Sequence, residues 1–256
     1  MPVNLMVIEM DKMKELVVPE WPAPRMVKAC VSTRLGGMSK GVYQGMNLGA
    51  HVGDAPDLVE ANRAKLKRLT NYPNTIQWLN QVHSDIAIEL PTEVDERTAD
   101  ASFTKQDNTV CAVLTADCLP AIFTNKEGTQ VAAAHAGWRG LCDGVLESTL
   151  KQFDEPSDVL VWLGPAIGPD CFEVGAEVRQ AFMDVDPEAE SAFKPSPNQG
   201  KWLGDLYLIA KQRLAKLGCQ QVFGGDLCTV TDKERFYSYR RDGVTGRMAT
   251  LIWIEK

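Results

Sequence analysis

Short apolar runs recur along the chain, and most of them are too short to form a helix. The runs VCAVLT at residues 110–115 and QVAAAH at residues 130–135 are nearly continuous, which predicts strands that are buried on both faces. The same criterion predicts strands at residues 27–33, 75–79, 85–90, 110–115, 120–124, 130–135, 158–163, 221–224 and 247–254.

Longer segments that repeat apolar residues at three- and four-residue intervals are typical of helices. Such segments occur at residues 55–69, 137–153, 175–185 and 204–217. Asp54 is predicted to cap the first helix, with Pro56 in its first turn, and Gly218 is predicted to end the last. Strands outnumber helices and do not alternate with them, which favours an α+β fold over a doubly wound sheet.

The chain is predicted to form a single domain over residues 1–256, because its length suits one large core and it contains no internal repeat. The longest polar, proline-containing stretch covers residues 184–201. Amphipathic structure resumes on both sides of it, so we interpret it as a surface excursion between two helices, not as a domain boundary.

Composition restricts the class of protein. The net charge is −7, so the basic surface of a general nucleic-acid binder is not expected, although one pocket for a small anion is compatible with it. No run reaches the length of a membrane span, and MPVNLMVIEMDKMKEL does not have the pattern of a signal peptide. The seven cysteines are scattered and form no CxxC pair. We therefore expect a cytoplasmic protein that binds neither membranes nor nucleic acid.

The sequence contains only three histidines, and two of them end predicted strands. His83 closes IQWLNQVH, His135 closes QVAAAH, and Cys118 lies in TADCLP between two strands. Two imidazoles and a thiolate form a three-ligand set for zinc or copper that leaves one position open. The spacings match no compact zinc motif, so structural roles for all three residues stay open.

A second use of the same residues is nucleophilic catalysis. Cys118 would then attack the substrate, and His135 or His83 would take its proton. Asp117 is a candidate to orient that histidine, although as the neighbour of Cys118 it is expected to point to the other side. The sequence does not separate a thiolate ligand from a thiolate nucleophile.

Three arginine-containing segments are candidate anion sites. Arg139 lies in HAGWRG, where a helix is predicted to begin at Gly137, and Arg34 lies in the glycine-rich STRLGGMSKG. The third segment, RFYSYRRDGVTGR, combines four arginines with three aromatic residues. Each also has a structural interpretation, as a turn, a surface hairpin or an edge strand with solvated charges.

These motifs resemble those of the YfiH/YlmD family, which is also called the multicopper polyphenol oxidoreductase or laccase-domain family. The resemblance extends over residues 32–254 and is carried by STRLGGMSKGVYQGMNLGAHVGD, NQVHS, VLTADCLPAIFT, AAAHAGWRGL, LGPAIGPDCFEVGAEV, GDLCT and RFYSYRRDGVTGRMATLIWI. It implies a single α+β domain with a central mixed β-sandwich flanked by helices, similar to the catalytic domain of cytotoxic necrotizing factor toxins.

The resemblance also implies a site and an activity. His83, Cys118 and His135 fall on the family's metal ligands and are the expected catalytic residues, with zinc as the usual metal and copper as the alternative. Family members phosphorolyse adenosine, inosine and methylthioadenosine, deaminate adenosine, and are linked in bacteria to peptidoglycan editing. We expect the substrates to be a nucleoside and phosphate, and the substrate pocket to be lined by Arg34, Asn47, Gln81 and Arg139.

Several roles stay open. Arg34, Arg139 and the helix start at Gly137 are the candidates for binding phosphate, and the only candidate for the general acid is Asp117. The rival functions are a copper-dependent polyphenol oxidase, a peptidoglycan-editing amidase with Cys118 as its nucleophile, and a binding-only module. A blue-copper centre would leave only His51 for further copper ions, so a multicopper cluster of imidazoles cannot be built here. His51 has no assigned role.

Overall fold

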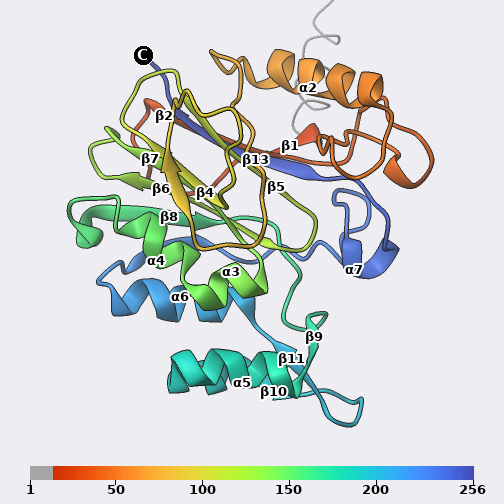
Figure 1. The fold of residues 1–256 in the computed structure, drawn as a ribbon, viewed down its shortest axis with the longest axis vertical. Helices are drawn as coiled ribbons and strands as arrows, with labels where there is room; N and C mark the ends of the chain where they lie inside the picture. Colours follow the sequence, from red (N-terminus) through yellow and green to blue (C-terminus); the bar gives the residue numbers. More distant parts are fainter. Residues whose placement is uncertain (1–13) are drawn as a thin grey trace, which may run out of the picture.

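Two β-sheets pack face to face at the centre of the molecule (Figure 1). The computed structural model describes residues 14–256, so the predicted absence of a signal peptide concerns a segment largely outside the described residues. The first sheet is antiparallel throughout. Its strand order is β1 (Leu16–Val17), β2 (Val27–Ser32), β13 (Met248–Ile254) and β5 (Val110–Thr115).

The second sheet is mixed, because β12 pairs with β8 and β3 pairs with β4 in parallel, while its other pairs are antiparallel. Its order is β12 (Gln221–Gly224), β8 (Val159–Leu163), β6 (Leu119–Asn125), β7 (Val131–Ala136), β4 (Ala101–Thr104) and β3 (Ala87–Glu89). The predicted α+β fold built around a β-sandwich is confirmed.

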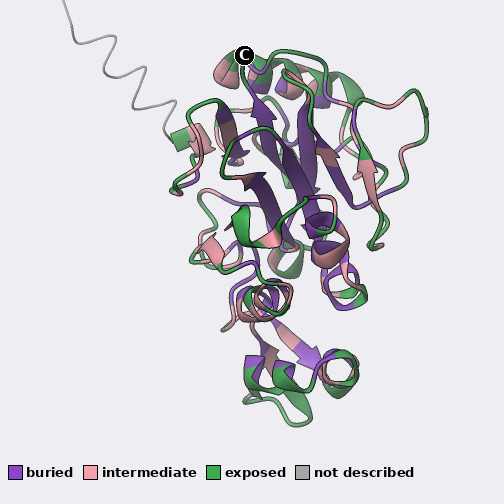
Figure 2. Ribbon diagram, turned by 90° about the vertical axis from the view of Figure 1, so that its left-hand side faces the viewer, coloured by how far each residue is buried: buried purple, intermediate pink, exposed green. Residues whose placement is uncertain are grey.

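The continuous apolar runs are explained by burial of both sheet faces, and the central strands are buried along their length (Figure 2). In β5, Cys111 and Val113 point into the space between the sheets, and Ala112 and Leu114 point to the other side. Because neighbouring side chains of a strand alternate between faces, a strand covered on both sides must be apolar at every position.

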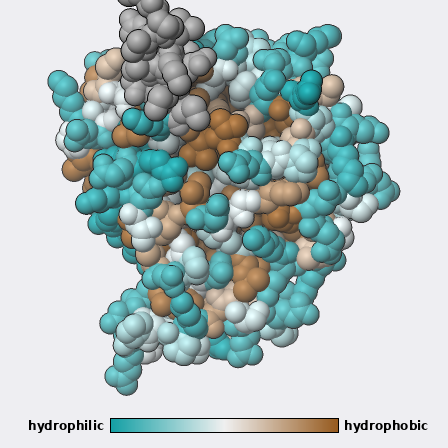
Figure 3. Space-filling model, turned by 180° about the vertical axis from the view of Figure 1, so that it is seen from behind, coloured by the Kyte–Doolittle hydropathy of each residue, from teal (hydrophilic) through white to brown (hydrophobic). Residues whose placement is uncertain are grey.

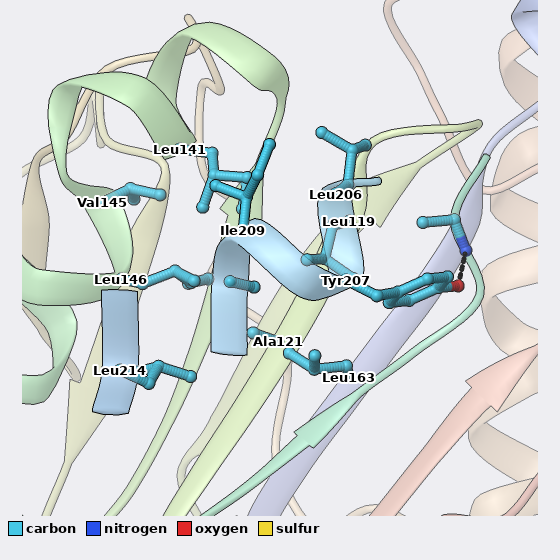
Figure 4. Close-up of a cluster of buried hydrophobic side chains, with 14 of the residues drawn as sticks. Leu119, Ala121, Leu141, Val145, Leu146, Leu163, Leu206, Tyr207, Ile209 and Leu214 are labelled. Carbon is cyan, nitrogen blue, oxygen red and sulfur yellow. Dashed lines mark hydrogen bonds between the residues drawn. The ribbon is translucent and has the colours of Figure 1, made fainter. Parts of the chain in front are cut away.

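Helices cover the outer face of each sheet. On the six-stranded sheet lie α3 (Trp138–Asp143), α4 (Val145–Leu150) and α6 (Leu206–Lys216). Figure 4 shows Leu146, Ile209 and Leu214 of these helices packed on Ala121 and Leu163 of the sheet. On the four-stranded sheet lies α2 (Pro56–Thr70), which contributes its buried residue Leu66.

A smaller lobe extends from the sandwich at the end opposite the C-terminus (Figure 1). It consists of α5 (Ala176–Val185), the 3₁₀ helix η3 (Pro187–Ala192), and a sheet with the order β10 (Phe193–Pro195), β11 (Lys201–Gly204), β9 (Glu173–Gly175). Its apolar residues Val178, Phe182 and Phe193 belong to the same cluster as α4 and α6. The lobe is therefore part of the one domain, and η3 and β10 fold out of the predicted surface excursion.

The remaining elements are short and connect the layers. They are the 3₁₀ helices η1 (Gly41–Tyr43) and η2 (Pro156–Asp158) and the helix α7 (Tyr239–Asp242). Seen from behind, the surface is mostly hydrophilic, with apolar residues in small patches (Figure 3). Within residues 14–256, no helix is long and apolar enough to span a membrane.

Several predicted elements differ from the structure. Residues 75–79 form no strand. The Gln77 side chain bonds to the backbone of Thr92, and an isolated bridge follows at Asn80. Residues 85–90 contain only the short strand β3. Strands β1, β4, β9, β10 and β11 were not predicted, since their short sequences show no clear alternation.

Two helix predictions also need correction. The helix predicted at residues 137–153 divides into α3 and α4 at Gly144, whose φ of 106° lies outside the helical region. Ala55 occupies the N-cap position of α2, so Asp54 does not cap that helix as predicted. Its carboxylate instead accepts hydrogen bonds from Ser39, Asn47 and the Ala55 backbone.

The packing of α2 on the four-stranded sheet is expected to contribute to the free energy of unfolding. Leu66→Ala is expected to lower the free energy of unfolding by about 2–5 kcal/mol, because the fully buried side chain leaves a cavity. Urea titration followed by circular dichroism measures this change. Glu60→Ala, on the exposed face of the same helix, is the matched control and should change the value by less than about 0.5 kcal/mol. Equal effects of the two substitutions would contradict the packing described.

Candidate metal centre

Cys118 lies where the chain passes from one sheet of the sandwich to the other, between the end of β5 and the start of β6. Asp117 precedes it with a φ of 90°. The Asp117 carboxylate accepts hydrogen bonds from Thr229 Oγ1 at 2.6 Å, Ser238 Oγ at 3.1 Å and the Arg240 backbone N–H at 2.6 Å. Asp117 therefore holds this crossing in place and orients neither histidine.

His135 is buried near the end of β7, opposite Pro120 of β6. Its Nδ1 lies 2.7 Å from Oδ1 of Asp100, and its backbone N–H donates to the Asp100 carbonyl at 2.7 Å. Since Nδ1 is engaged by the carboxylate, Nε2 is the ring nitrogen left to bind a metal or to act on Cys118.

The sequence predicts that His83 ends a strand, but the structure places it on a loop, where its φ is 64°. The Asp100 carboxylate accepts the backbone N–H groups of Val82, His83 and Ser84 at 3.1, 3.0 and 2.6 Å. The same carboxylate thus fixes the loop that carries one histidine and the ring of the other. Asp100 carried no signal in the sequence, because nothing in ERTADAS distinguishes it from other surface-like acids.

The three side chains form a compact donor set. Their ligand atoms all lie within 4.8 Å of one another, and Cys118 Sγ lies 3.7 Å from His83 Nε2. In a tetrahedral site with Zn–S of about 2.3 Å and Zn–N of about 2.0 Å, sulfur and nitrogen are about 3.5 Å apart. A carboxylate bonded to the second nitrogen of a ligating histidine is also usual in metal sites. The donors therefore fit zinc, and their chemistry suits copper as well.

Electrostatics favour the metal-binding form of the thiol. Burial raises the pKa of Cys118, but the neighbouring His135 and His83 outweigh burial and bring that pKa down to about 6. Burial likewise raises the pKa of Asp100, yet hydrogen bonds from His135 and Ser84 lower it to about 2. Burial lowers the pKa of His135, whereas Cys118 and Asp100 raise it to about 9. A metal therefore competes with a proton on His135, so its affinity rises with pH.

Gly137 leaves the room that the donor set needs. A Cβ at this position would lie 2.4 Å from Cδ2 of His83 and 3.2 Å from Sγ of Cys118. Real Cβ contacts of the first length do not occur, so any larger residue must displace the His83 ring. Glycine is thus required at position 137 because a larger side chain would collide with the donor set.

The donor set opens into a cavity of about 340 Å³, which is within the range of small-molecule sites. Besides the three donors, the cavity is lined by His51, Gln81, Leu114, Thr115, Ala116, Asp117, Trp138, Ile167, Phe172, Leu206, Tyr239, Arg240 and Arg247. Strand ends of both sheets, the α6 start and the loop before β13 therefore meet at one site.

Of the four residues predicted to bind substrate, only Gln81 lines this cavity, where its amide pairs with both backbone groups of Leu114. The structure does not bring the other three to it. Arg34 lies over the ring of Tyr237, and Arg139 lies over that of Trp138.

Asn47 is the third of them, and it is fully buried. Its side chain bonds to Gly49, Asp54 and the backbone N–H of Arg247. It therefore holds the loop that leads to Arg247 instead of facing a ligand.

Arg240 and Arg247 line the cavity, and both belong to the segment RFYSYRRDGVTGR. The sequence alone did not decide whether the arginines of this segment are solvated or bind an anion. Nη1 of Arg240 donates to the carbonyls of Cys171 and Glu173, and Nη1 of Arg247 donates to those of Thr245 and Gly246. Burial lowers the pKa of Arg247. The clustering of arginines with aromatic residues was the signal that could have identified them.

His51 also lines the cavity and is the one histidine outside the donor set. Burial is the main cause that lowers its pKa, and the positive charges of Arg247 and Arg63 lower it further. His51 is therefore a neutral hydrogen-bonding group at neutral pH.

The protein has a β-sandwich and a His–Cys–His donor set that opens into a cavity large enough for a small molecule. These features are those of a candidate metalloenzyme. The sequence matches the family described as "Multi-copper polyphenol oxidoreductase laccase" over residues 28–255, and the chain belongs to that family. The resemblance inferred from its motifs is thereby confirmed.

Named relatives and solved structures agree with this assignment. The chain is 55% identical to purine nucleoside phosphorylase YfiH of Escherichia coli, over 94% of this chain and 100% of that protein. It is 51% identical to purine nucleoside phosphorylase PA4543 of Pseudomonas aeruginosa, over 95% and 100%. The crystal structure of Neisseria meningitidis protein NMB0706 matches with a TM-score of 0.89 at 45% identity, over 94% of this chain and 100% of that one. YlmD from Geobacillus stearothermophilus matches with a TM-score of 0.83 at 30% identity, over 92% and 94%.

The contact between Gly137 and His83 predicts that Gly137→Ala weakens metal binding by about 10-fold or more, because the added methyl displaces one ligand. Zinc affinity is measured by competition with a chromophoric chelator. Gly175→Ala is the matched control, since its methyl meets only the carboxylate end of the exposed Glu177. Equal zinc affinities of the two variants would contradict this geometry.

Proposed function

We propose that this protein is a metal-dependent purine nucleoside phosphorylase. The observation that carries the proposal is the meeting, in one cavity, of a His–Cys–His donor set, aromatic side chains and two arginines. The names of its relatives support the same activity. Zinc is the metal we favour, held by His83, Cys118 and His135, with copper as the alternative.

The cavity offers a partner for each part of a nucleoside and for phosphate. Trp138 and Phe172 provide aromatic surface against which a purine can stack. Arg240 and Arg247 provide planar, permanently charged groups that suit phosphate. Their place in the cavity makes them better phosphate candidates than Arg34 or Arg139, which lie outside it.

In the proposed reaction, a phosphate oxygen attacks C1′ of the ribose while the bond from C1′ to the purine breaks. The base leaves with the bonding electron pair and takes up a proton, and the products are free base and ribose 1-phosphate. The arginines hold phosphate in line with C1′ and offset its charge. When bound, the metal supplies a Lewis acid beside the substrate.

The same cavity is proposed to support deamination of adenosine, in which water replaces the amino group at C6 and ammonia leaves. This reaction requires a nucleophilic water and a proton for the departing ammonia. Asp117 does not supply that proton, because its carboxylate is bonded to Thr229, Ser238 and Arg240. His51, Gln81, Thr115 and Tyr239 are polar groups of the cavity lining that are proposed to position the base and the water.

A second candidate function has one observation in its favour. Asp100, His135 and Cys118 lie in the order of a carboxylate–histidine–cysteine triad, which suits an amidase acting on peptidoglycan fragments. That mechanism gives no role to His83, whose Nε2 lies 3.7 Å from the same sulfur. The position of His83 therefore favours the metal site over the nucleophile.

The proposal predicts that adenosine and phosphate yield adenine and ribose 1-phosphate, and that adenosine alone yields inosine. Cys118→Ala should lower kcat/KM by about 100-fold or more, because it removes one of the three donors. Cys142→Ala, which alters a buried cysteine outside the cavity, should retain activity. Chromatography of bases and sugar phosphates measures both.

Three outcomes would overturn the proposal. Equal base release by wild type and Cys118→Ala would mark the activity as contamination. Free ribose in place of ribose 1-phosphate would indicate a hydrolase. Oxygen uptake on a phenolic substrate by copper-loaded protein, without base release, would indicate the polyphenol oxidase.

A further inference from the structure

Two half-buried cysteines outside the metal centre come together beside the cavity wall. Cys171 ends a turn in which its backbone N–H donates to the carbonyl of Gly168 at 2.9 Å. The backbone N–H of the same Gly168 donates to Sγ of Cys228 at 3.3 Å. One glycine thus joins both cysteines, although they are far apart in the sequence. The Cys228 side chain also lies close enough to Cys171 to raise the pKa of the Cys171 thiol.

The two thiols have different surroundings. Burial raises the pKa of Cys228, but the hydroxyl and N–H of Thr231 and the N–H groups of Gly168 and Val230 outweigh burial and lower that pKa. Burial and the neighbouring Cys228 both raise the pKa of Cys171. A thiol whose anion is stabilised by several donors, beside a second thiol that stays protonated, is the arrangement of an attacking and a resolving cysteine.

The other cysteines outside the metal centre differ from this pair. Burial raises the pKa of Cys30 and of Cys111 to about 12, and that of Cys219 to about 11. Burial also raises the pKa of Cys142, and all four side chains are buried. They are therefore packing residues with little access to oxidants.

We propose that Cys171 and Cys228 form an oxidisable pair that closes to a reversible disulfide on exposure to hydrogen peroxide. The Cys228 thiolate attacks one peroxide oxygen, the O–O bond breaks, and with one proton the products are a sulfenic acid and water. The Cys171 thiol then attacks the sulfenic sulfur, and its proton leaves with the hydroxyl as a second water. The two cysteines lose two electrons, and peroxide gains them.

The disulfide would change the cavity wall. Arg240 donates to the carbonyl of Cys171 and lies over the ring of Phe172, the next residue along the chain. Both Phe172 and Arg240 line the cavity. Drawing Cys171 towards Cys228 therefore moves the proposed phosphate and base contacts. This consequence rests on the proposed function, whereas the disulfide itself does not.

The test uses metal-loaded, full-length protein treated with a small excess of peroxide, blocked with an alkylating agent and digested with trypsin without reduction. Cys171 lies alone in the peptide of residues 152–179, and Cys228 shares the peptide of residues 217–233 with Cys219. A cross-link between these peptides, with a mass loss of about 2 Da that a dithiol reductant reverses, is expected. It should vanish in Cys171→Ser and in Cys228→Ser, and persist in Cys219→Ser.

Every other pattern contradicts the pair. A cross-link that survives in Cys171→Ser, or one that joins Cys118, would assign the chemistry elsewhere. Alkylation of both thiols after peroxide treatment, or a sulfinic acid on Cys228 with Cys171 unmodified, would show that no disulfide forms. Because the readout is mass, its failure is distinct from failure of the nucleoside assay. If the cross-link forms, nucleoside KM should rise several-fold and return after reduction, while Cys171→Ser stays unchanged by peroxide.

Discussion

Both histidines of the candidate site are positioned by a single buried carboxylate. Asp100 bonds to the ring of His135 and to three successive backbone N–H groups of the loop that carries His83. These two ligand-bearing segments are far apart in the sequence, and no ladder of strand hydrogen bonds joins the His83 loop to β7. The Asp100 carboxylate links the two segments instead, because it accepts hydrogen bonds from both of them. Its own charge is preserved by those donors, which hold the pKa of Asp100 near 2.

The sandwich brings the third donor to the same point. Cys118 lies on the crossing between the sheets, and Asp117 fixes that crossing through Thr229, Ser238 and the backbone of Arg240. Two buried aspartates thus position different donors of the site. Asp100 orients the histidines, and Asp117 joins the cysteine to the segment that leads to Arg240 and Arg247. The donor set and the basic side of the cavity are therefore parts of one hydrogen-bonded unit.

Much of the fold could be predicted from the sequence, because strands covered on both faces must be apolar throughout, as β5 and β7 are. That His83, Cys118 and His135 lie together could be predicted, because few side chains bind zinc or copper and the sequence has only three histidines. Asp100 could not, since its partners are three backbone N–H groups and the side chains of His135 and Ser84, which are brought near it only by folding. Which arginines line the cavity could not be predicted, for a related reason. Arg34 precedes a glycine-rich loop and Arg139 follows the Gly137 turn, but each lies over an aromatic ring. Only tertiary packing decides which way such side chains face.

The role of Asp100 in positioning the candidate metal ligands is measured by a zinc titration against a chelator. Asp100→Asn keeps the shape of the side chain but removes the charge and one acceptor oxygen. Zinc affinity at neutral pH is expected to fall by about 10- to 100-fold relative to wild type, because the ligands lose their orientation. An Asp100→Asn protein that binds zinc as tightly as wild type would contradict this role.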